Sequence, residues 1–270
     1  MIGALVCSIG AVICYMLCYH MTTERVKVEQ NTQKFSFKEL ISEIAHNKAL
    51  IGIIVCALLF LLAQLSLSNM NNYIYPNYFG NVSAMSLANL AGMVVILVLS
   101  TFIVKLSAKV GKKELSVIGS IISAAAFLIL FFIHTDNVWV WIVLVLISSV
   151  GTAMFNMVIW AMITDVIDDS EVRTGVRQDG TIYSVYSFAR KLGQACSSGI
   201  SGVLLSIIGY TAATAHDPKV VDGIYNVTCL VPALGMILLF LALQFLYPLN
   251  KKRVEENAKI LKERREAKVQ

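Results

Sequence analysis

Charged residues are scarce in this 270-residue chain. Asp, Glu, Lys and Arg make up 14% of it, whereas 57% is hydrophobic, and the mean hydropathy is +0.72. A water-soluble domain of this size keeps a large polar surface, so the composition excludes a soluble globular protein. Helices satisfy all of their own backbone amides inside a bilayer. The chain is therefore predicted to be an all-α integral membrane protein.

The chain also lacks the residue patterns of common chemical sites. Its six cysteines are scattered through apolar stretches, with no Cys-x-x-Cys pair and no metal-ligand spacing to histidine. We therefore expect neither a disulfide framework nor a metal site. The sequence contains no pair of catalytic residues inside an apolar stretch and no glycine loop that would hold phosphate. We expect no enzyme activity and no cofactor.

Seven apolar stretches are long enough to cross a bilayer as helices, which takes about 20 residues. They cover residues 2–19, 49–68, 84–104, 115–133, 138–164, 181–213 and 224–247. The domain organisation follows from them. We expect a first transmembrane helix in 1–19, a cytoplasmic link in 20–48, a six-helix unit in 49–248 and a charged cytoplasmic tail in 249–270. Within the link, 36–46 has the apolar face of an amphipathic helix on the membrane surface.

Basic residues predict the orientation in the membrane. Nearly all Lys and Arg residues fall in the first, third and fifth links and in the tail, while the second and fourth links have none. Because cytoplasmic links are enriched in basic residues, the N-terminus is expected outside and the C-terminus in the cytoplasm. The expected location is the plasma membrane, as in a bacterial inner membrane. The net charge of +5 thus reports topology and does not support a nucleic-acid partner.

Polar residues within the apolar stretches are candidates for function because they are costly in lipid. Two stretches carry such residues on one helical face, which would line a bundle interior or a watery cavity. Hydrogen bonding between helices is the alternative, and it is favoured for each Ser or Thr alone. Asn156 with Trp160, and Lys191, favour the cavity. The two faces comprise Thr152, Asn156, Trp160 and Thr164, and Ser184, Ser187, Lys191, Gln194 and Ser198, with Tyr183 and Arg190 on the flank.

Lys191 is the most informative single residue. A helix that starts near Thr181 places it roughly 15 Å along the axis, about half the hydrocarbon thickness. A buried ammonium group needs a carboxylate, yet no Asp or Glu lies well inside any apolar stretch. We therefore expect a buried Lys191 whose partner this chain does not supply. The alternative is a helix that starts near Arg190, with Lys191 reaching the membrane surface.

Two cytoplasmic motifs and one shorter match carry a family resemblance. The first is Lys105-Leu106-x-x-Lys109-x-Gly111-Lys112-Lys113. The second consists of Asp165-x-x-Asp168, Glu171, Thr174-Gly175-x-Arg177, Asp179-Gly180, Tyr183-Ser184 and Phe188-x-x-Lys191-x-Gly193-Gln194. The shorter match is Thr23-Glu24-Arg25-Val26. In order and spacing they resemble the glycoside–pentoside–hexuronide:cation symporters, the family of the melibiose permease, which has the major facilitator fold. Asp169 departs from the pattern, since many members carry an aromatic residue there.

The resemblance implies that the seven stretches are helices six to twelve of a twelve-helix transporter, a half-plus-one of the major facilitator fold. Helices one to five would then be absent, in agreement with the outside N-terminus and the unpartnered Lys191. The implied activity is secondary active transport of a sugar or glycoside with a monovalent cation, sodium or proton, bound mainly by the missing half. The chain alone would not be transport-competent. Its expected partners are the sugar, the cation, the lipid bilayer, and a separately encoded N-terminal half or a second copy.

The resemblance also implies residue roles. The substrate cavity would include Asn156, Trp160, Thr164, Tyr183, Ser187 and Gln194, and Lys191 would serve cation coupling. A cytoplasmic gate would include Asp165, Asp168, Glu171, Arg173, Arg177 and Asp179, and the facilitator motif is Lys105, Lys109, Gly111 and Lys112. Two alternatives from other classes stay open: a receptor-like seven-helix protein, and a structural or assembly subunit of a membrane complex.

Overall fold

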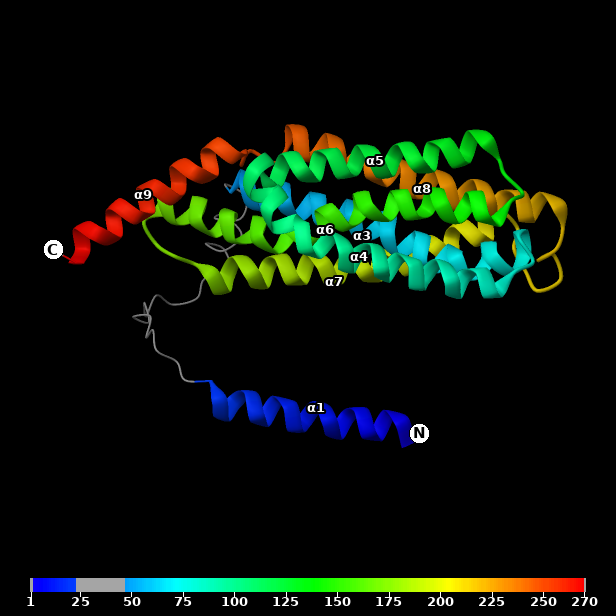
Figure 1. Cartoon of the computed structure of the whole chain (residues 1–270), viewed down its shortest axis with the longest axis horizontal. Coiled ribbons are helices and arrows are strands. Elements are labelled where there is room, and N and C mark those ends of the chain that lie inside the picture. The colour runs from blue at the N-terminus through cyan, green and yellow to red at the C-terminus, as the bar shows by residue number, and fades with distance from the viewer. Residues whose placement is uncertain (1, 23–46, 270) are drawn as a thin grey trace. The chain divides into compact units, whose positions relative to one another are not determined.

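The computed structural model describes residues 2–22 and 47–269 and divides the chain into two units, 1–40 and 41–270. The described part of the first unit is one apolar helix, α1 (Ile2–Met21), which matches the first predicted span (Figure 1). The predicted amphipathic helix in 36–46 and the motif beginning at Thr23 lie outside the described residues. The second unit holds everything discussed below, and we call its described part, residues 47–269, the bundle.

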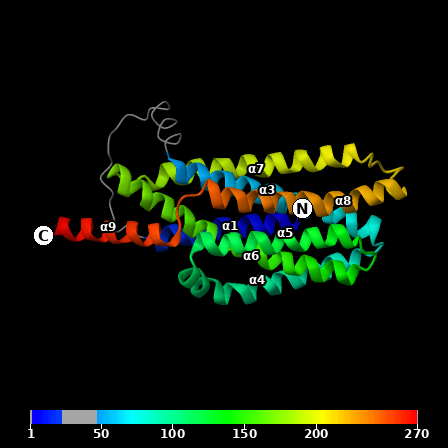
Figure 2. The same ribbon diagram turned by 90° about the horizontal axis from the view of Figure 1, so that it is seen from above.

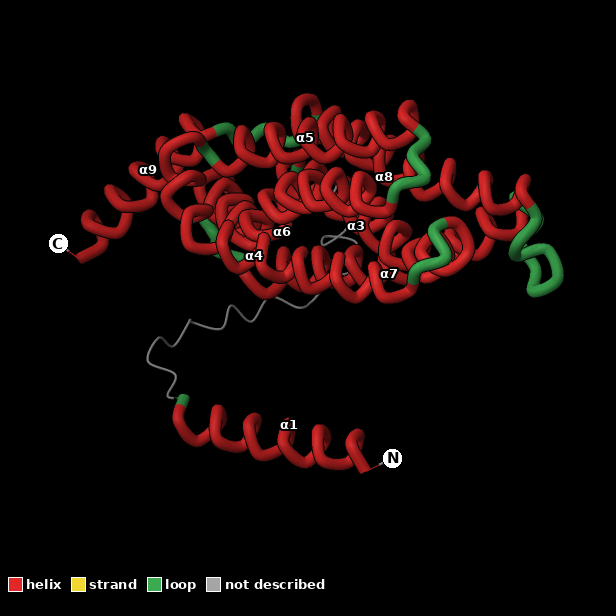
Figure 3. The backbone as a smooth tube through the Cα atoms, turned by 45° about the vertical axis from the view of Figure 1, so that its right-hand side comes forward, coloured by secondary structure: helices red, strands yellow, loops and turns green. Residues whose placement is uncertain are grey.

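The bundle is helical from one end of the described sequence to the other, with short connections (Figure 3). Its long helices run lengthwise beside one another (Figures 1 and 2). In chain order they are α3 (Lys48–Tyr73), the short π-helix η1 (Ile74–Tyr78), α4 (Val82–Val110), α5 (Lys112–Ile133), α6 (Val138–Thr174), α7 (Asp179–Ile207), α8 (Pro218–Phe245) and α9 (Lys251–Val269).

Asparagine side chains define three of the helix starts. The Oδ1 atoms of Asn47, Asn81 and Asn137 accept hydrogen bonds from backbone amides two or three residues on, at 3.0, 3.1 and 2.9 Å. Each bond satisfies an amide that has no partner within the helix. At the other end of α6, Gly175 takes a positive φ of 76° and its amide donates to the carbonyl of Glu171. Glycine adopts this conformation without strain, so α6 ends there.

Small residues bring α5 and α6 together. A Cβ added at Gly119 would collide with the carbonyl of Gly151, and a Cβ at Gly151 with that of Gly119. One turn further along, the hydroxyls of Ser123 and Ser148 share a 2.7 Å hydrogen bond. In lipid, where helices gain little from the hydrophobic effect, such close backbone approach is a main source of helix association. Elsewhere α3 packs on α7 and α8, and α5 packs on α8.

Six of the described helical segments are long and apolar enough to cross a membrane: α1, α3 with η1, α4, α5, α6 and α8. The helix expected in 181–213 is present as α7, but it is not among the six; it carries Arg190, Lys191 and Gln194 and many serines. The expected number of seven spans is therefore not confirmed. α7 also ends at Ile207, short of the predicted residue 213, and Gly209 follows with a φ of 75°.

The charged tail is a helix, α9, that docks on the bundle. Nearly all of its described charged side chains are exposed, as expected for a charged tail. The uncharged Asn257 and Leu261 are buried, and α9 contacts α5 and α6. Figures 1 and 2 both place α9 at the end of the bundle where α6 ends and α7 begins. The tail is thus part of the packed structure at that end.

Candidate functional site

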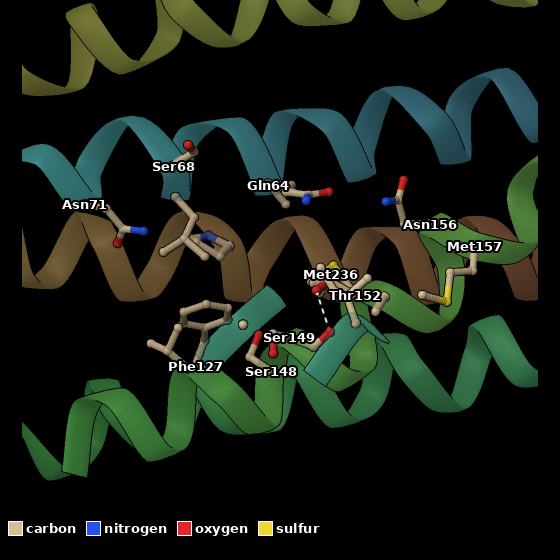
Figure 4. A pocket seen from close by; sticks show the side chains of 17 residues that line it. Gln64, Ser68, Asn71, Phe127, Ser148, Ser149, Thr152, Asn156, Met157 and Met236 are labelled. Atoms are coloured by element: carbon tan, nitrogen blue, oxygen red, sulfur yellow. Dashed lines mark hydrogen bonds between the residues drawn. The ribbon is translucent and has the colours of Figure 1, made fainter. Parts of the chain in front are cut away.

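Five helices of the bundle, α3, α4, α5, α6 and α8, surround a cavity of about 210 Å³ (Figure 4). Its polar lining consists of uncharged amides and hydroxyls, with apolar groups such as Phe127, Pro232 and Met236 between them. The Oδ1 atom of Asn71 is buried there and accepts no hydrogen bond from the described residues. Such a lining suits a neutral molecule with many hydroxyl groups. The polar residues are Gln64, Ser68, Asn71, Ser148, Ser149, Thr152 and Asn156.

The residues expected to form a single substrate cavity fall into separate groups. Asn156 lines the cavity just described, whereas Trp160, Tyr183 and Gln194 do not. Thr164 donates from Oγ1 to the carbonyl of Trp160 at 3.4 Å, and Ser187 is half-buried on α7. The physical reason is the packing of α7, which lies mainly against α3 and makes few contacts with α6. The polar faces of α6 and α7 therefore do not enclose one space within this chain.

An aromatic and cationic cluster bridges α6 and α7. The ring of Trp160 is 6.1 Å from Tyr183 and 6.0 Å from Tyr186, and Trp160 is 45% exposed. The guanidinium carbon of Arg190 lies 4.7 Å from the centre of the Trp160 ring, which is a cation–π contact. Its Nη1 atom is 3.4 Å from the hydroxyl of Tyr186. Sequence reasoning placed Arg190 only on the flank, although its helical spacing from Tyr183 and Tyr186 put all three on one side of α7.

Lys191 lies well inside α7, because the helix starts at Asp179, twelve residues earlier, or roughly 18 Å along the axis. The alternative of a helix that starts near Arg190 is therefore wrong. The side chain of Lys191 is exposed on this chain, and its Nζ donates to Oε1 of Gln194 at 3.2 Å. Within residues 2–22 and 47–269 no carboxylate pairs with it. The bundle alone does not provide the burial that we expected.

The facilitator motif and the predicted gate meet at one ion pair. Nζ of Lys112, at the start of α5, lies 2.6 Å from Oδ1 of Asp165 on α6, and Asp165 is only 7% exposed. Gly111 makes the sharp turn before α5 with a φ of 114°, and a Cβ there would collide with the carboxylate of Glu114. Lys105 is exposed. Sequence reasoning assigned Lys112 and Asp165 to different groups and missed their pairing.

A second ion-pair cluster centres on Arg177. Its guanidinium lies 2.9 Å from Asp168, 2.8 Å from Glu171 and 2.8 Å from Asp179. Burial alone would lower the pKa of Arg177, but its bonds to the three carboxylates outweigh burial and raise that pKa. Asp168 and Glu171 lie near the end of α6, Arg177 lies in the connection, and Asp179 is the first residue of α7. Of the six predicted gate residues, all except Asp165 and Arg173 come together here, and their ion pairs link the end of α6 to the start of α7.

Asp169 anchors α9 to α6. It is 3% exposed, and its Oδ1 accepts hydrogen bonds from Nε of Arg253 at 3.1 Å and Nδ2 of Asn257 at 3.0 Å. Arg173, another predicted gate residue, lies 3.8 Å from the same carboxylate. An aromatic residue, which the resemblance implies for many members at this position, would offer α9 no such acceptor. The sequence showed only that Asp169 departs from the pattern, because its partners are far along the chain.

Long apolar helices, a neutral polar cavity within the bundle and charged clusters at the helix ends are features of a multi-pass membrane protein. The chain belongs to the MFS/sugar transport protein family, whose sequence profile matches residues 1–251. The family resemblance predicted from the cytoplasmic motifs is thereby confirmed, as is the location in a bacterial inner membrane. Members of this family transport sugars and are not enzymes.

Several bacterial relatives are similar to the chain. It is 30% identical over 259 residues to the glucuronide carrier protein homolog of Escherichia coli (strain K12), which covers 93% of the chain and 55% of the carrier. It is 31% identical over 237 residues to an uncharacterized symporter of Bacillus subtilis (strain 168), with 87% and 51% covered. For the isoprimeverose transporter of Lactiplantibacillus pentosus the identity is 25% over 267 residues, with 94% and 55% covered. The chain spans about half the length of the curated relatives it matches.

Proposed function

We propose that the chain forms one wall of the substrate path in a secondary transporter that couples a sugar or glycoside to sodium or protons. The observation that carries this proposal is the cavity with its uncharged polar lining, to which Asn156 contributes one helical turn from the exposed Trp160. Amides and hydroxyls exchange hydrogen bonds with sugar hydroxyls, and an aromatic ring packs against the apolar face of a sugar. The names of the glucuronide carrier and isoprimeverose transporter support a sugar as substrate.

The proposed topology has α7 as a seventh crossing, with the N-terminus outside. α7 has 29 residues, which make a helix of about 44 Å, longer than the hydrocarbon core of about 30 Å. It runs lengthwise beside the apolar helices (Figure 2). Its polar side chains would then face protein or water in place of lipid. The end that holds Lys112, Arg177 and α9 would lie in the cytoplasm, as the basic residues predict.

The ion pairs at this end are proposed to form the cytoplasmic gate. Lys112 and Asp165 tie α5 to α6, and Arg177 ties α6 to α7, so a change in either would alter how the ends of these helices sit together. The pairs of Arg177 are partly exposed and contribute only about 0–1 kcal/mol each, which suits contacts that break in every cycle. Charge reversal in Arg177→Glu is expected to lower the transport rate of the assembled protein. An unchanged rate would count against the gate.

Cation coupling is proposed to need residues beyond the bundle. Lys191 has no carboxylate partner among the described residues, so we infer that its counter-ion comes from an N-terminal half or a second copy in the assembled transporter. Membership of a sugar transport family favours this function over the receptor-like and assembly-subunit alternatives.

The proposal is tested by sugar uptake into proteoliposomes under imposed sodium or proton gradients. One sample holds the chain alone, and the other holds the chain co-produced with the N-terminal half of the E. coli glucuronide carrier homolog. We expect gradient-driven uptake only in the second sample. Gradient-driven uptake by the chain alone would contradict the need for a partner half. Failure of both samples to take up or bind any sugar would contradict the proposed function.

A further inference from the structure

We propose that Asn71 is a specificity-determining residue of the neutral cavity, whose side-chain oxygen accepts a hydrogen bond from one hydroxyl group of the bound sugar. This inference rests on the proposed function and adds the residue that selects among sugars. The residues expected from sequence to line the cavity lie on α6 and α7, whereas Asn71 lies on α3. Three observations carry the inference: an unpaired oxygen, the bonding of the other polar groups in the cavity, and a neighbouring π-helix.

The side-chain oxygen of Asn71 is buried without a hydrogen-bond donor. Asn71 projects from α3 into the cavity (Figure 4), and its Oδ1 atom has no partner in residues 2–22 and 47–269. Among the described residues that line this cavity, no other has a buried side-chain oxygen or nitrogen atom left unpaired. An unpaired buried acceptor is destabilising and calls for an explanation. A ligand hydroxyl at this point would supply the donor.

The hydroxyl groups that α6 contributes to the cavity already form hydrogen bonds within the protein. Ser149 donates to the carbonyl of Leu146 at 2.7 Å, and Thr152 donates to the carbonyl of Ser149 at 3.1 Å. The hydroxyl of Ser148 shares its 2.7 Å hydrogen bond with Ser123 on α5. These groups serve the helix itself and the contact between helices, so they contribute less to the selection of a ligand.

The carboxamides of the cavity are in a different situation. The side chains of Gln64, Asn71 and Asn156 line it and form no hydrogen bond with any described residue. A carboxamide has two donors and one acceptor oxygen, and a few such groups fix the orientation of a ligand in a pocket. Gln64 and Asn156 are exposed, whereas the oxygen of Asn71 is buried. Water therefore competes least at Asn71, and a missing ligand donor is felt most there.

Asn71 lies where α3 changes into the π-helix η1. The amide of Ile74 donates to the carbonyls of both Met70 and Asn71. Within η1 the amide of Phe79 donates to the carbonyl of Ile74, five residues earlier, at 3.2 Å. Single π-helical turns are frequent at functional sites. Ile74 and Tyr75 are buried, so the packing of η1 holds this end of α3, and with it Asn71, in place.

The lining residues of the cavity all come from this chain, so binding is measured on the purified chain in detergent by isothermal titration calorimetry. The probes are the methyl β-D-glycosides of glucose, galactose and xylose, and the monodeoxyfluoro derivatives of whichever of them binds most tightly. Fluorine is similar in size to a hydroxyl group and has no hydrogen to donate. We expect one derivative to bind about tenfold more weakly than its parent, because Asn71 then lacks its donor.

The variants assign that penalty to Asn71. In Asn71→Leu the parent should bind about tenfold more weakly, and the penalty of the one derivative should disappear while the penalties at other positions remain. Asn71→Asp keeps an acceptor oxygen and should retain the penalty. The matched control is Asn72→Leu, because Asn72 is exposed, bonds only to carbonyls of its own helix and does not line the cavity; it should bind as wild type.

Thermal unfolding followed by circular dichroism separates recognition from folding. Asn71→Leu should unfold at the wild-type midpoint or above, because it removes a buried acceptor that has no partner. Loss of binding together with a midpoint several degrees lower would overturn the inference and assign Asn71 to folding.

Two binding results would also overturn it while leaving sugar binding intact. One is an affinity for the parent glycoside that Asn71→Leu does not change, as expected if water satisfies Asn71. The other is a set of derivative penalties that is the same in the wild type and in Asn71→Leu. No binding of any of the three glycosides would instead contradict sugar binding itself, and with it the proposed function.

Discussion

Replacing Lys112 with methionine should destabilise the bundle far more than the same change at Lys105 in the same motif. The side chain of Asp165 is 8% exposed and has its ion pair 2.6 Å away at Lys112. Removing one partner of a fully buried pair costs about 3–5 kcal/mol, because the other charge is left without compensation. Lys112 is 30% exposed, so solvent screens part of the interaction. We therefore expect a loss of about 2–3 kcal/mol in the free energy of unfolding.

Thermal unfolding in detergent, followed by far-UV circular dichroism, measures this loss. For a chain of this size each kcal/mol shifts the midpoint by about 2–4 °C, so Lys112→Met should lower it by roughly 4–12 °C. Lys105→Met is the matched control, because Lys105 is exposed and no described carboxylate pairs with it. Its expected change is within about 0.5 kcal/mol, as for most surface substitutions.

A double-mutant cycle isolates the pair. In Lys112→Met with Asp165→Asn, the buried charge is gone, so the double variant should be more stable than Lys112→Met alone. The coupling energy should be about 1–2 kcal/mol, within the range for residues in direct contact. Equal midpoints for Lys112→Met and Lys105→Met, or a coupling energy near zero, would refute the view that this pair holds α5 to α6.

Two further changes test the packing of the helices. Gly151→Leu should lower the free energy of unfolding by about 3 kcal/mol or more, because its Cβ would collide with the carbonyl of Gly119. The folded yield measured by size-exclusion chromatography should therefore fall. The control is Gly199→Leu, which should behave as wild type because no heavy atom lies near the added Cβ. Asp169→Asn should release α9, so trypsin should cleave the tail several times faster than in the wild type. The control is Glu266→Gln, which removes only an exposed ion pair and should leave the cleavage rate unchanged. Equal cleavage rates for Asp169→Asn and the wild type would contradict the anchoring role of Asp169.

The class of the protein and most of its helices could be predicted from sequence. Apolar stretches predict the positions of the transmembrane helices directly, because a bilayer imposes the length and composition of each crossing. The prediction of 115–133 against α5 (Lys112–Ile133) shows how closely hydropathy locates such a helix. The boundary at 213 was wrong because the polar turn that begins after Ile207 lies within a stretch of mixed hydropathy. The cytoplasmic motifs were enough to predict the family.

The partners of the site residues were not predictable in the same way. Lys112 and Asp165 are 53 positions apart in sequence, and Asp169 and Arg253 are 84 apart. The sequence around each residue does not indicate which residue it pairs with. The spacing of the polar faces on α6 and α7 was correct, but spacing does not say which neighbour a face meets. α7 packs mainly on α3, so the two faces do not enclose one space, and Arg190, which the prediction had placed on the flank, lies against Trp160.

The sequence by itself determined that this is a helical membrane protein of a sugar transport family, since hydrophobic length and short motifs are properties of neighbouring residues. Tertiary structure decided which charges are paired, where the neutral cavity lies and that the tail is docked. Those features depend on contacts between helices, and the glycines at 119 and 151 fix the approach of two of them to within backbone contact. The order of residues along the chain determines which side chains each helix has, and packing between helices determines which other residues those side chains contact.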